Sequence, residues 1–190
     1  MEKKPKFNNK QNPLIQTKDN KEIYFSRSVS VNGILMIREE DDFKVLIVKR
    51  SKKMDQPNKW CLPCGYLDWD ESTYEAIIRE VFEETSIYIP EHQGFIIDDN
   101  NKREFSTNSK PDHNGKQNVA FNYMFIFDFE NTMPHKFQDY ILLRDKNNDE
   151  VTEFKWIEVS ELFRGGLDID WAFPHDEVIK LAYYHYMNNE

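Results

Sequence analysis

The chain has 190 residues, of which 39% are hydrophobic and 14% aromatic, a composition that suits one soluble globular domain with a substantial core. No apolar run approaches the roughly 18 residues that a membrane-spanning helix needs, and the first residues lack the apolar segment of a secretory signal, so we expect a cytoplasmic protein. The formal net charge of −9 argues against indiscriminate binding to nucleic acid.

The amino-terminal part of the chain divides into a polar tail and the start of a domain. Residues 1–20 are rich in Lys, Asn and Gln and have no hydrophobic periodicity, so we expect a disordered tail there and a single domain over residues 21–190. Residues 22–36 and 43–49 carry the β-branched and aromatic side chains typical of strands, and residues 51–59 form a polar loop between them and the next segment.

The segment from 65 to 87 predicts a loop followed by an amphipathic helix. Ser72 and Glu75 have the spacing of a capping box, so the helix should begin near Thr73. Apolar side chains recur at intervals of three or four residues and predict one buried face. The residues of this face are Tyr74, Ile77, Ile78, Val81 and Thr85.

Acidic residues gather on the other face of this helix. Residues three and four apart share a side of a helix, so Glu80, Glu83 and Glu84 should point the same way. Like charges at that spacing repel one another, and a hard divalent cation such as Mg²⁺ relieves the repulsion by binding carboxylate oxygens. The spacing therefore predicts a metal-binding face; a merely solvated charged face is the plainer alternative.

The rest of the chain alternates strands with hydrophilic loops before a final helix. The expected elements are a strand over 87–98 interrupted near 90–94, a flexible hairpin or lid over 100–116, a strand over 118–129, a loop over 133–149, a strand over 151–158 and a helix over 175–187. Strands flanked by two main helices predict an α+β sandwich.

The acidic helix resembles the signature of the Nudix hydrolases, G-x5-E-x7-R-E-U-x-E-E-x-G-U, where U is aliphatic. The residues in register are Gly65, Glu71, Arg79, Glu80, Val81, Glu83, Glu84 and Ile87. Ser86 departs from the pattern, because the family has glycine there, just past the helix end, where a left-handed backbone is common. The lead-in from Trp60 to Gly65 is similar to the W-x-L-P-G-G of the family, with Cys64 in place of its first glycine.

The resemblance implies a Nudix-type α/β/α sandwich with a mixed central sheet, and an enzyme that uses Mg²⁺ or Mn²⁺. Such an enzyme cleaves a nucleoside diphosphate linked to another group by attack of water on phosphorus, and ADP-ribose-like substrates are favoured here. Nucleoside triphosphates are the alternative substrates, and a non-catalytic nucleotide-sensing module is the alternative function. Related enzymes often pair, so a homodimer is compatible with the resemblance.

The resemblance also implies roles for residues of the signature. Glu80 would bind metal and could serve as general base, Glu83 and Glu84 would bind metal, and Arg79 would orient a carboxylate. Glu71 and Gly65 would support the loop and the helix.

Outside the signature, many members of the family add a carboxylate ahead of the last strand that helps to activate water. Glu153 is our first candidate and Glu150 our second. In some members a backbone carbonyl before the signature binds metal, which here would be that of Cys64.

The cysteines permit a second interpretation, since Trp60-Cys61-Leu62-Pro63-Cys64 is similar to a thioredoxin active site. That chemistry needs the first cysteine at a helix start, whereas the first helix-capping signal after Cys61 is at Ser72. A zinc site lacks further cysteine partners. We therefore expect both thiols to be reduced and ordinary.

The substrate contacts are less constrained by the sequence. Arg27 and Arg50 could contact phosphates, and Tyr24 could stack on a base. His175 follows an Ala-Phe-Pro segment similar to one in Nudix proteins that act on ADP-ribose, which would place it near the substrate; a plain helix-start residue is the alternative.

Overall fold

The computed structural model describes residues 14–24, 27–39, 42–87, 89, 95–97, 103–110, 117–128 and 149–189. None of the helices in these ranges has the length and apolar character needed to cross a membrane.

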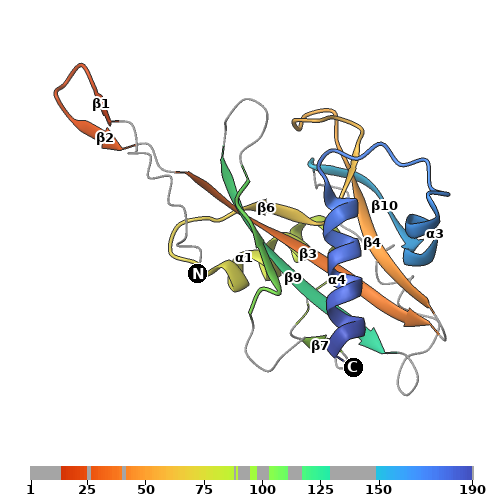
Figure 1. Ribbon diagram of the computed structural model, residues 1–190. Coiled ribbons are helices and arrows are strands. Elements are labelled where there is room, and N and C mark those ends of the chain that lie inside the picture. The colour runs from red at the N-terminus through yellow and green to blue at the C-terminus, as the bar shows by residue number, and fades with distance from the viewer. Residues whose placement is uncertain are drawn as a thin grey trace, which may run out of the picture.

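A mixed sheet forms the centre of the molecule (Figure 1), with its main strands in the order β10-β4-β3-β9-β7. Their bounds are Val151–Glu158, Asp42–Arg50, Ser28–Glu39, Asn118–Asp128 and Phe95–Ile97. The shorter strands β5 (Trp60–Cys61), β6 (Cys64–Tyr66) and β8 (Ser106–Asn108) pair with β4, β3 and β9. The pairing of β3 with β9 is parallel and the pairing of β3 with β4 is antiparallel, so the sheet is mixed, as predicted.

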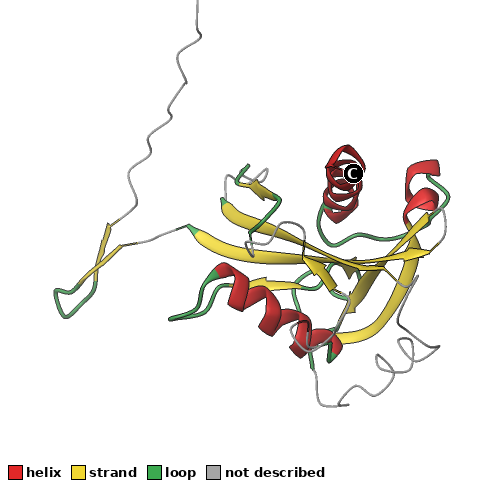
Figure 2. Cartoon of the chain, turned by 90° about the horizontal axis from the view of Figure 1, so that it is seen from below, coloured by secondary structure: helices red, strands yellow, loops and turns green. Residues whose placement is uncertain are grey.

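Helices cover both faces of this sheet (Figure 2). Helix α1 (Thr73–Thr85) packs on one face, and α3 (Val159–Arg164) and α4 (His175–Asn189) lie on the other. Side chains of a strand alternate between faces: Val31 and Leu35 of β3 join the core beneath α1, whereas Ile34 and Met36 join the core beneath α3 and α4. The predicted α/β/α sandwich is confirmed.

Helix α1 begins and ends where its sequence predicts. The Ser72 side chain accepts from the Glu75 backbone N–H, and the Glu75 side chain accepts from the Ser72 backbone N–H, which completes the capping box. The apolar stripe is buried under the helix through Ile77, Ile78 and Val81. At the other end Ser86 adopts the left-handed conformation, with φ 61°, and its N–H caps the carbonyl of Phe82 at 2.7 Å.

The amino-terminal hairpin extends into the tail that we expected to be disordered. Strands β1 (Leu14–Gln16) and β2 (Glu22–Tyr24) pair antiparallel and project away from the main sheet in Figure 1. The Thr17 side chain binds the backbone N–H of Lys21, and Asn20 supplies a left-handed residue at φ 62°, so the polar stretch serves as a turn. Residues 1–13 lie outside the described part of the chain.

The other loops are described only in part. The predicted hairpin over 100–116 contributes β8 on the edge of β9, whereas its residues 100–102 and 111–116 lie outside the described residues. Of the predicted loop over 133–149, all but residue 149 lie outside them as well. Of the strand expected over 87–98, the structure describes β7 alone as a strand.

Candidate active site

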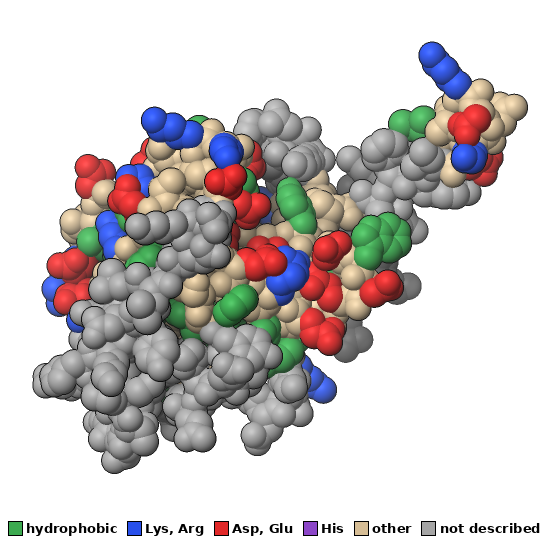
Figure 3. Space-filling model, turned by 180° about the vertical axis from the view of Figure 1, so that it is seen from behind, with side chains coloured by type: hydrophobic (Ala, Val, Ile, Leu, Met, Phe, Trp, Pro, Cys, Tyr) green, Lys and Arg blue, Asp and Glu red, His purple; other side chains and the backbone are tan. Residues whose placement is uncertain are grey.

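Arg79 binds the loop before α1 to the acidic face of the helix. Its guanidinium donates to both carboxylate oxygens of Glu71, at 2.7 and 3.1 Å, and to the Tyr66 carbonyl at 3.1 Å. It also donates to Glu80 at 2.8 Å and to Glu83 at 3.1 Å. The hydrogen bonds from Arg79 to Glu71 hold the pKa of the Glu71 carboxyl group below its ordinary value. Figure 3 shows the resulting surface, with acidic side chains gathered around a basic one.

Glu80 lies against the backbone of Gly65 on β6. A Cβ atom built on Gly65 would overlap the Glu80 carboxylate, so the residue must be glycine for this contact to exist. The Glu80 side chain is largely buried, and burial raises the pKa of its carboxyl group. The hydrogen bond from Arg79 therefore does not fully offset the cost of burying a deprotonated Glu80.

Glu84 points inward, one helical turn farther along. It is 2% exposed and accepts a hydrogen bond from the Cys64 backbone N–H at 3.1 Å. Burial is the main cause that raises the pKa of Glu84 well above its ordinary value, and the charges of Cys61 and Glu80 add to it. Glu83 stays at the surface, its side chain 55% exposed.

The three glutamates do not converge on one point: in the described part of the chain, no group of three or more His, Cys, Asp or Glu side chains is arranged to hold a metal ion. The residues nevertheless fit a Mg²⁺ or Mn²⁺ ion in their chemistry, because two buried carboxyl groups with raised pKa gain from an added cation. Mg²⁺ commonly uses one or two carboxylates and fills its other positions with water and phosphate oxygens.

The two carboxylates proposed from outside the signature lie in different surroundings. Glu153 forms an ion pair with Lys49 at 2.8 Å across the β10–β4 pairing. The charge of Glu150 contributes to the raised pKa of both Glu80 and Glu84, so Glu150 lies within electrostatic range of both carboxyl groups. Its backbone is held by the hydrogen bond from Ser51 N–H to its carbonyl, at 2.7 Å.

The side chains of His175 and Arg50 are both buried and both form hydrogen bonds with other residues of the chain. His175 is buried, and its Nδ1 accepts from the Leu62 backbone N–H at 2.9 Å, which joins the start of α4 to the link between β5 and β6. Burial lowers the pKa of His175 to about 3, so the ring is neutral. Arg50 is 6% exposed, donates to the Asp55 carbonyl at 2.8 Å and to its carboxylate, and lies over the Phe173 ring. The structure thus favours the plain helix-start interpretation of His175.

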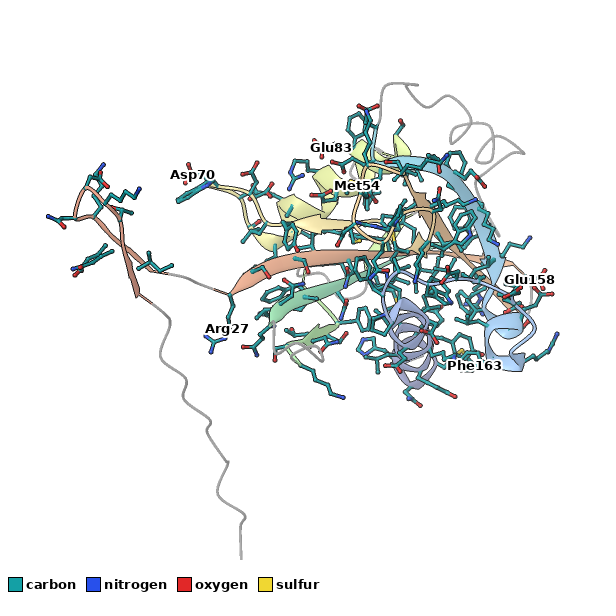
Figure 4. The ribbon with its side chains drawn as sticks, turned by 90° about the horizontal axis from the view of Figure 1, so that it is seen from above. Arg27, Met54, Asp70, Glu83, Glu158 and Phe163 are labelled. Atoms are coloured by element: carbon teal, nitrogen blue, oxygen red, sulfur yellow. The ribbon has the colours of Figure 1, made fainter. Side chains whose placement is uncertain are left out.

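The remaining predicted substrate contacts lie before β3: Tyr24 ends β2 of the separate two-stranded sheet, and Arg27 immediately precedes β3. Arg27 donates to Gln117, and Figure 4 shows it at the opposite side of the sheet from Glu83. The side chain of Tyr24 is outside what the structure describes.

The cysteines are free but interact with each other. Cys61 is buried and Cys64 is half-buried. The hydrogen bond between the two thiols and the nearby Arg50 lower the pKa of Cys61, and the same hydrogen bond together with burial raises that of Cys64.

The sequence did not single out the backbone partners of the acidic helix. The Tyr66 carbonyl and the Cys64 N–H bind Arg79 and Glu84; neither contact depends on a side chain, and the only signal for them was their position next to Gly65.

Comparison with known proteins agrees with this architecture. A family model described as the NUDIX domain matches residues 27–182. An ADP-ribose pyrophosphatase of Methanocaldococcus jannaschii is 28% identical over 171 residues, which cover 88% of this chain and 80% of that protein.

Two solved structures show the same fold. The NUDIX domain of Shewanella oneidensis NrtR, complexed with ADP ribose, gives a TM-score of 0.56 at 21% identity and covers 85% of this chain and 90% of its own. A bifunctional NMN adenylyltransferase/ADP ribose pyrophosphatase of Francisella tularensis, complexed with AMP and a Mn ion, gives 0.60 at 21% identity over 84% of this chain and 42% of its own. The chain belongs to the NUDIX domain family.

Proposed function

We propose that this NUDIX-family protein is a divalent-cation-dependent hydrolase that cleaves the diphosphate linkage of a nucleoside diphosphate joined to a second group, with ADP-ribose the favoured kind of substrate. The observation that carries the proposal is the pair of buried carboxyl groups of Glu80 and Glu84, placed against the backbone of Gly65 and Cys64. The relative from Methanocaldococcus jannaschii, named as an ADP-ribose pyrophosphatase, supports the substrate class.

In this proposal Glu80 and Glu84 would hold Mg²⁺ or Mn²⁺ together with the more exposed Glu83. When bound, the cation lowers the pKa of a water molecule and offsets charge on the phosphate oxygens. Arg79 acts as a positioning residue, since it fixes Glu80 and Glu83 while its other bonds hold Glu71 and the Tyr66 carbonyl.

The reaction consumes one water molecule for each linkage. The water oxygen attacks one phosphorus, the bond from that phosphorus to the bridging oxygen breaks, and two phosphate monoesters leave. A carboxylate must take the proton from the water. We assign this role to Glu150 ahead of Glu153, because the charge of Glu150 acts on both Glu80 and Glu84 whereas Glu153 is paired with Lys49.

A substrate panel tests the proposal. Purified protein is incubated with Mg²⁺ or Mn²⁺ and ADP-ribose, NADH, dinucleoside polyphosphates, sugar nucleotides or nucleoside triphosphates, and the products are separated and quantified. ADP-ribose should be converted to AMP and ribose 5-phosphate, and Glu83→Gln and Glu84→Gln should reduce the rate. Glu177→Gln, at an exposed position of α4, is the matched control and should not.

The opposite result would be equally informative. Saturable binding of a nucleotide without turnover of any compound would overturn the hydrolase and favour a nucleotide-sensing module. Faster hydrolysis of nucleoside triphosphates than of ADP-ribose would support the hydrolase activity but would assign the enzyme a different substrate class.

A further inference from the structure

The loop between β4 and β5 is held in one shape by its own contacts. Its two ends are joined, because the Asn58 N–H donates to the Arg50 carbonyl at 3.0 Å. The buried Arg50 guanidinium reaches across the loop and donates to the Asp55 carbonyl at 2.8 Å and to the Asp55 carboxylate. The hydroxyl group of Ser51, which is also buried, accepts from the Lys53 N–H at 3.2 Å.

Two residues of this loop also contact the segment that leads into β10. The Ser51 N–H donates to the Glu150 carbonyl at 2.7 Å, and the Lys53 ammonium group donates to the Asp149 carboxylate at 2.5 Å. The side chains of this ion pair are 69% and 74% exposed. An exposed ion pair contributes little to stability, so we expect this one to affect where residues 149 and 150 lie rather than whether the chain folds.

Glu150 lies where the regular pairing of β10 with β4 ends. The first residue of β10 in register with β4 is Val151, opposite Arg50, and the register shifts between Val151 and Glu153. A β-bulge interrupts the ladder of hydrogen bonds and bends the strand, and such bulges are common next to active sites. The contacts from the loop therefore hold the segment at the point where the strand pairing stops holding it.

The same segment lies next to the acidic site. Val151 belongs to a small buried cluster against which Cys64 packs, and the Cys64 N–H donates to Glu84 at 3.1 Å. The charge of Glu150 acts on the carboxyl groups of both Glu80 and Glu84. A movement of residues 149 and 150 therefore changes the surroundings of both buried carboxyl groups.

We propose that Ser51 and Lys53 are positioning residues that hold Glu150 in place for proton transfer from the attacking water, Ser51 through the Glu150 backbone and Lys53 through Asp149. The catalytic part of this inference rests on the proposed function, in which Glu150 accepts that proton, whereas the contacts themselves do not. A displacement of about 1 Å costs up to about 100-fold in rate, so the loss of one of the two contacts should lower kcat by about tenfold.

Substitutions of Lys53 test the inference, because the contact of Ser51 runs through its backbone. Steady-state hydrolysis of ADP-ribose with Mg²⁺ is measured for wild type, Lys53→Met, Lys53→Arg and Lys52→Met. Lys53→Met should lower kcat by about tenfold, with KM and melting temperature unchanged. Lys53→Arg keeps the ion pair and should retain the wild-type rate. Lys52→Met removes the same charge from the neighbouring exposed position and should retain it as well.

A second set of variants tests whether Lys53 acts through its partners. Asp149→Asn should reproduce the effect of Lys53→Met, and the exchanged pair Lys53→Asp with Asp149→Lys should restore most of the lost rate. In a Glu150→Gln background, Lys53→Met should have no further effect, because the group that it positions no longer accepts a proton. Losses that simply add, as they do for independent sites, would contradict the inference.

Unchanged kcat in Lys53→Met, or an equal loss in Lys52→Met, would overturn the inference. If wild type hydrolyses no compound of the panel, the proposed function fails by itself, and hydrogen exchange then tests the contacts separately. The amides of residues 149–153, followed by mass spectrometry, should exchange faster in Lys53→Met than in wild type and Lys52→Met. Equal exchange in all three proteins would show that the loop does not hold this segment.

Discussion

Gly65 and Glu80 are in such close contact that a methyl group on the glycine would occupy the position of the glutamate carboxylate. Strand β6 thus packs beneath the acidic site. The contact fixes the position of the segment from Trp60 to Gly65 relative to helix α1. The arrangement leaves Glu80 largely buried, with the Arg79 guanidinium donating a hydrogen bond to its carboxylate.

Gly65→Ala should impair activity much more than stability. The new methyl group displaces the end of a flexible side chain, which costs little in folding, but it moves a proposed metal ligand. We expect kcat/KM to fall on the order of 100-fold, with a melting temperature close to wild type.

Gly33→Ala is the matched comparison. Its Cβ would meet Ile77 Cδ1 and Val81 Cγ2 at 3.0 Å beneath α1, so it should lower the free energy of unfolding by roughly 1–3 kcal/mol. Steady-state kinetics and thermal melting of both variants check the pair. Equal loss of activity in the two would show that Gly65 matters only for packing.

The His175 ring predicts a specific acid sensitivity. Its pKa is about 3 in the folded protein against an ordinary value of 6.5, so between these values the unfolded chain binds a proton that the folded chain does not. The stability that depends on neutral His175 is complete above pH 6.5 and falls as pH decreases towards 3, by about 1.4 kcal/mol per pH unit within that window.

His175→Asn isolates this contribution. The Asn side-chain oxygen can accept from the Leu62 N–H in place of Nδ1, but it does not titrate. Denaturant unfolding at several pH values should give a smaller loss of stability on acidification in this variant than in wild type. His175→Ala, which leaves the Leu62 N–H without its acceptor, should be destabilised at every pH by roughly 1–3 kcal/mol. Parallel pH profiles for wild type and His175→Asn would contradict a neutral buried ring.

Local patterns in the sequence predicted helix α1 well, because they involve residues within one or two helical turns. The Ser72 and Glu75 capping box and the apolar stripe through Ile77 and Val81 require no knowledge of the rest of the chain. Contacts made across long sequence separations were not predictable in this way. The Leu62 N–H bonds to His175 and the Cys64 N–H bonds to Glu84, and such bonds exist only once the sheet has brought the segments together.

The ranking of Glu153 ahead of Glu150 as the water-activating carboxylate shows the same limit of prediction from the sequence. Strand β10 changes register between Val151 and Glu153, and a change of register alters which side chains lie on each face. Counting back from Trp156 therefore could not tell which of Glu150 and Glu153 lies within electrostatic range of Glu80 and Glu84.

Glu150→Gln should lower kcat by about 10²- to 10⁴-fold if Glu150 accepts the proton from water. Glu153→Gln removes only the ion pair with Lys49 and should leave kcat within about a factor of two, because an exposed pair contributes little. Single-turnover rates across a range of pH separate the two variants. A large effect of Glu153→Gln with a small effect of Glu150→Gln would restore the order expected from the sequence.

Ser86→Gly should stabilise the protein. Ser86 holds the left-handed conformation at φ 61° that ends α1, and glycine adopts it without the steric cost of a side chain. The expected gain is about 0.5–1 kcal/mol, measured by urea unfolding with the slope unchanged. A loss of stability would mean that the serine side chain makes a compensating interaction.

In the proposed mechanism, buried Glu84 and a divalent cation act together in hydrolysis. The most direct measurement is the initial rate of ADP-ribose cleavage as Mg²⁺ is titrated into metal-free wild type and Glu84→Gln, with melting temperature recorded for the same samples. Wild type should be inactive without the ion and saturate with it, gaining stability as the cation offsets two buried charges. Glu84→Gln should stay folded but remain slow at every Mg²⁺ concentration. Equal rates for the two proteins, or full activity of wild type without a divalent ion, would contradict the account.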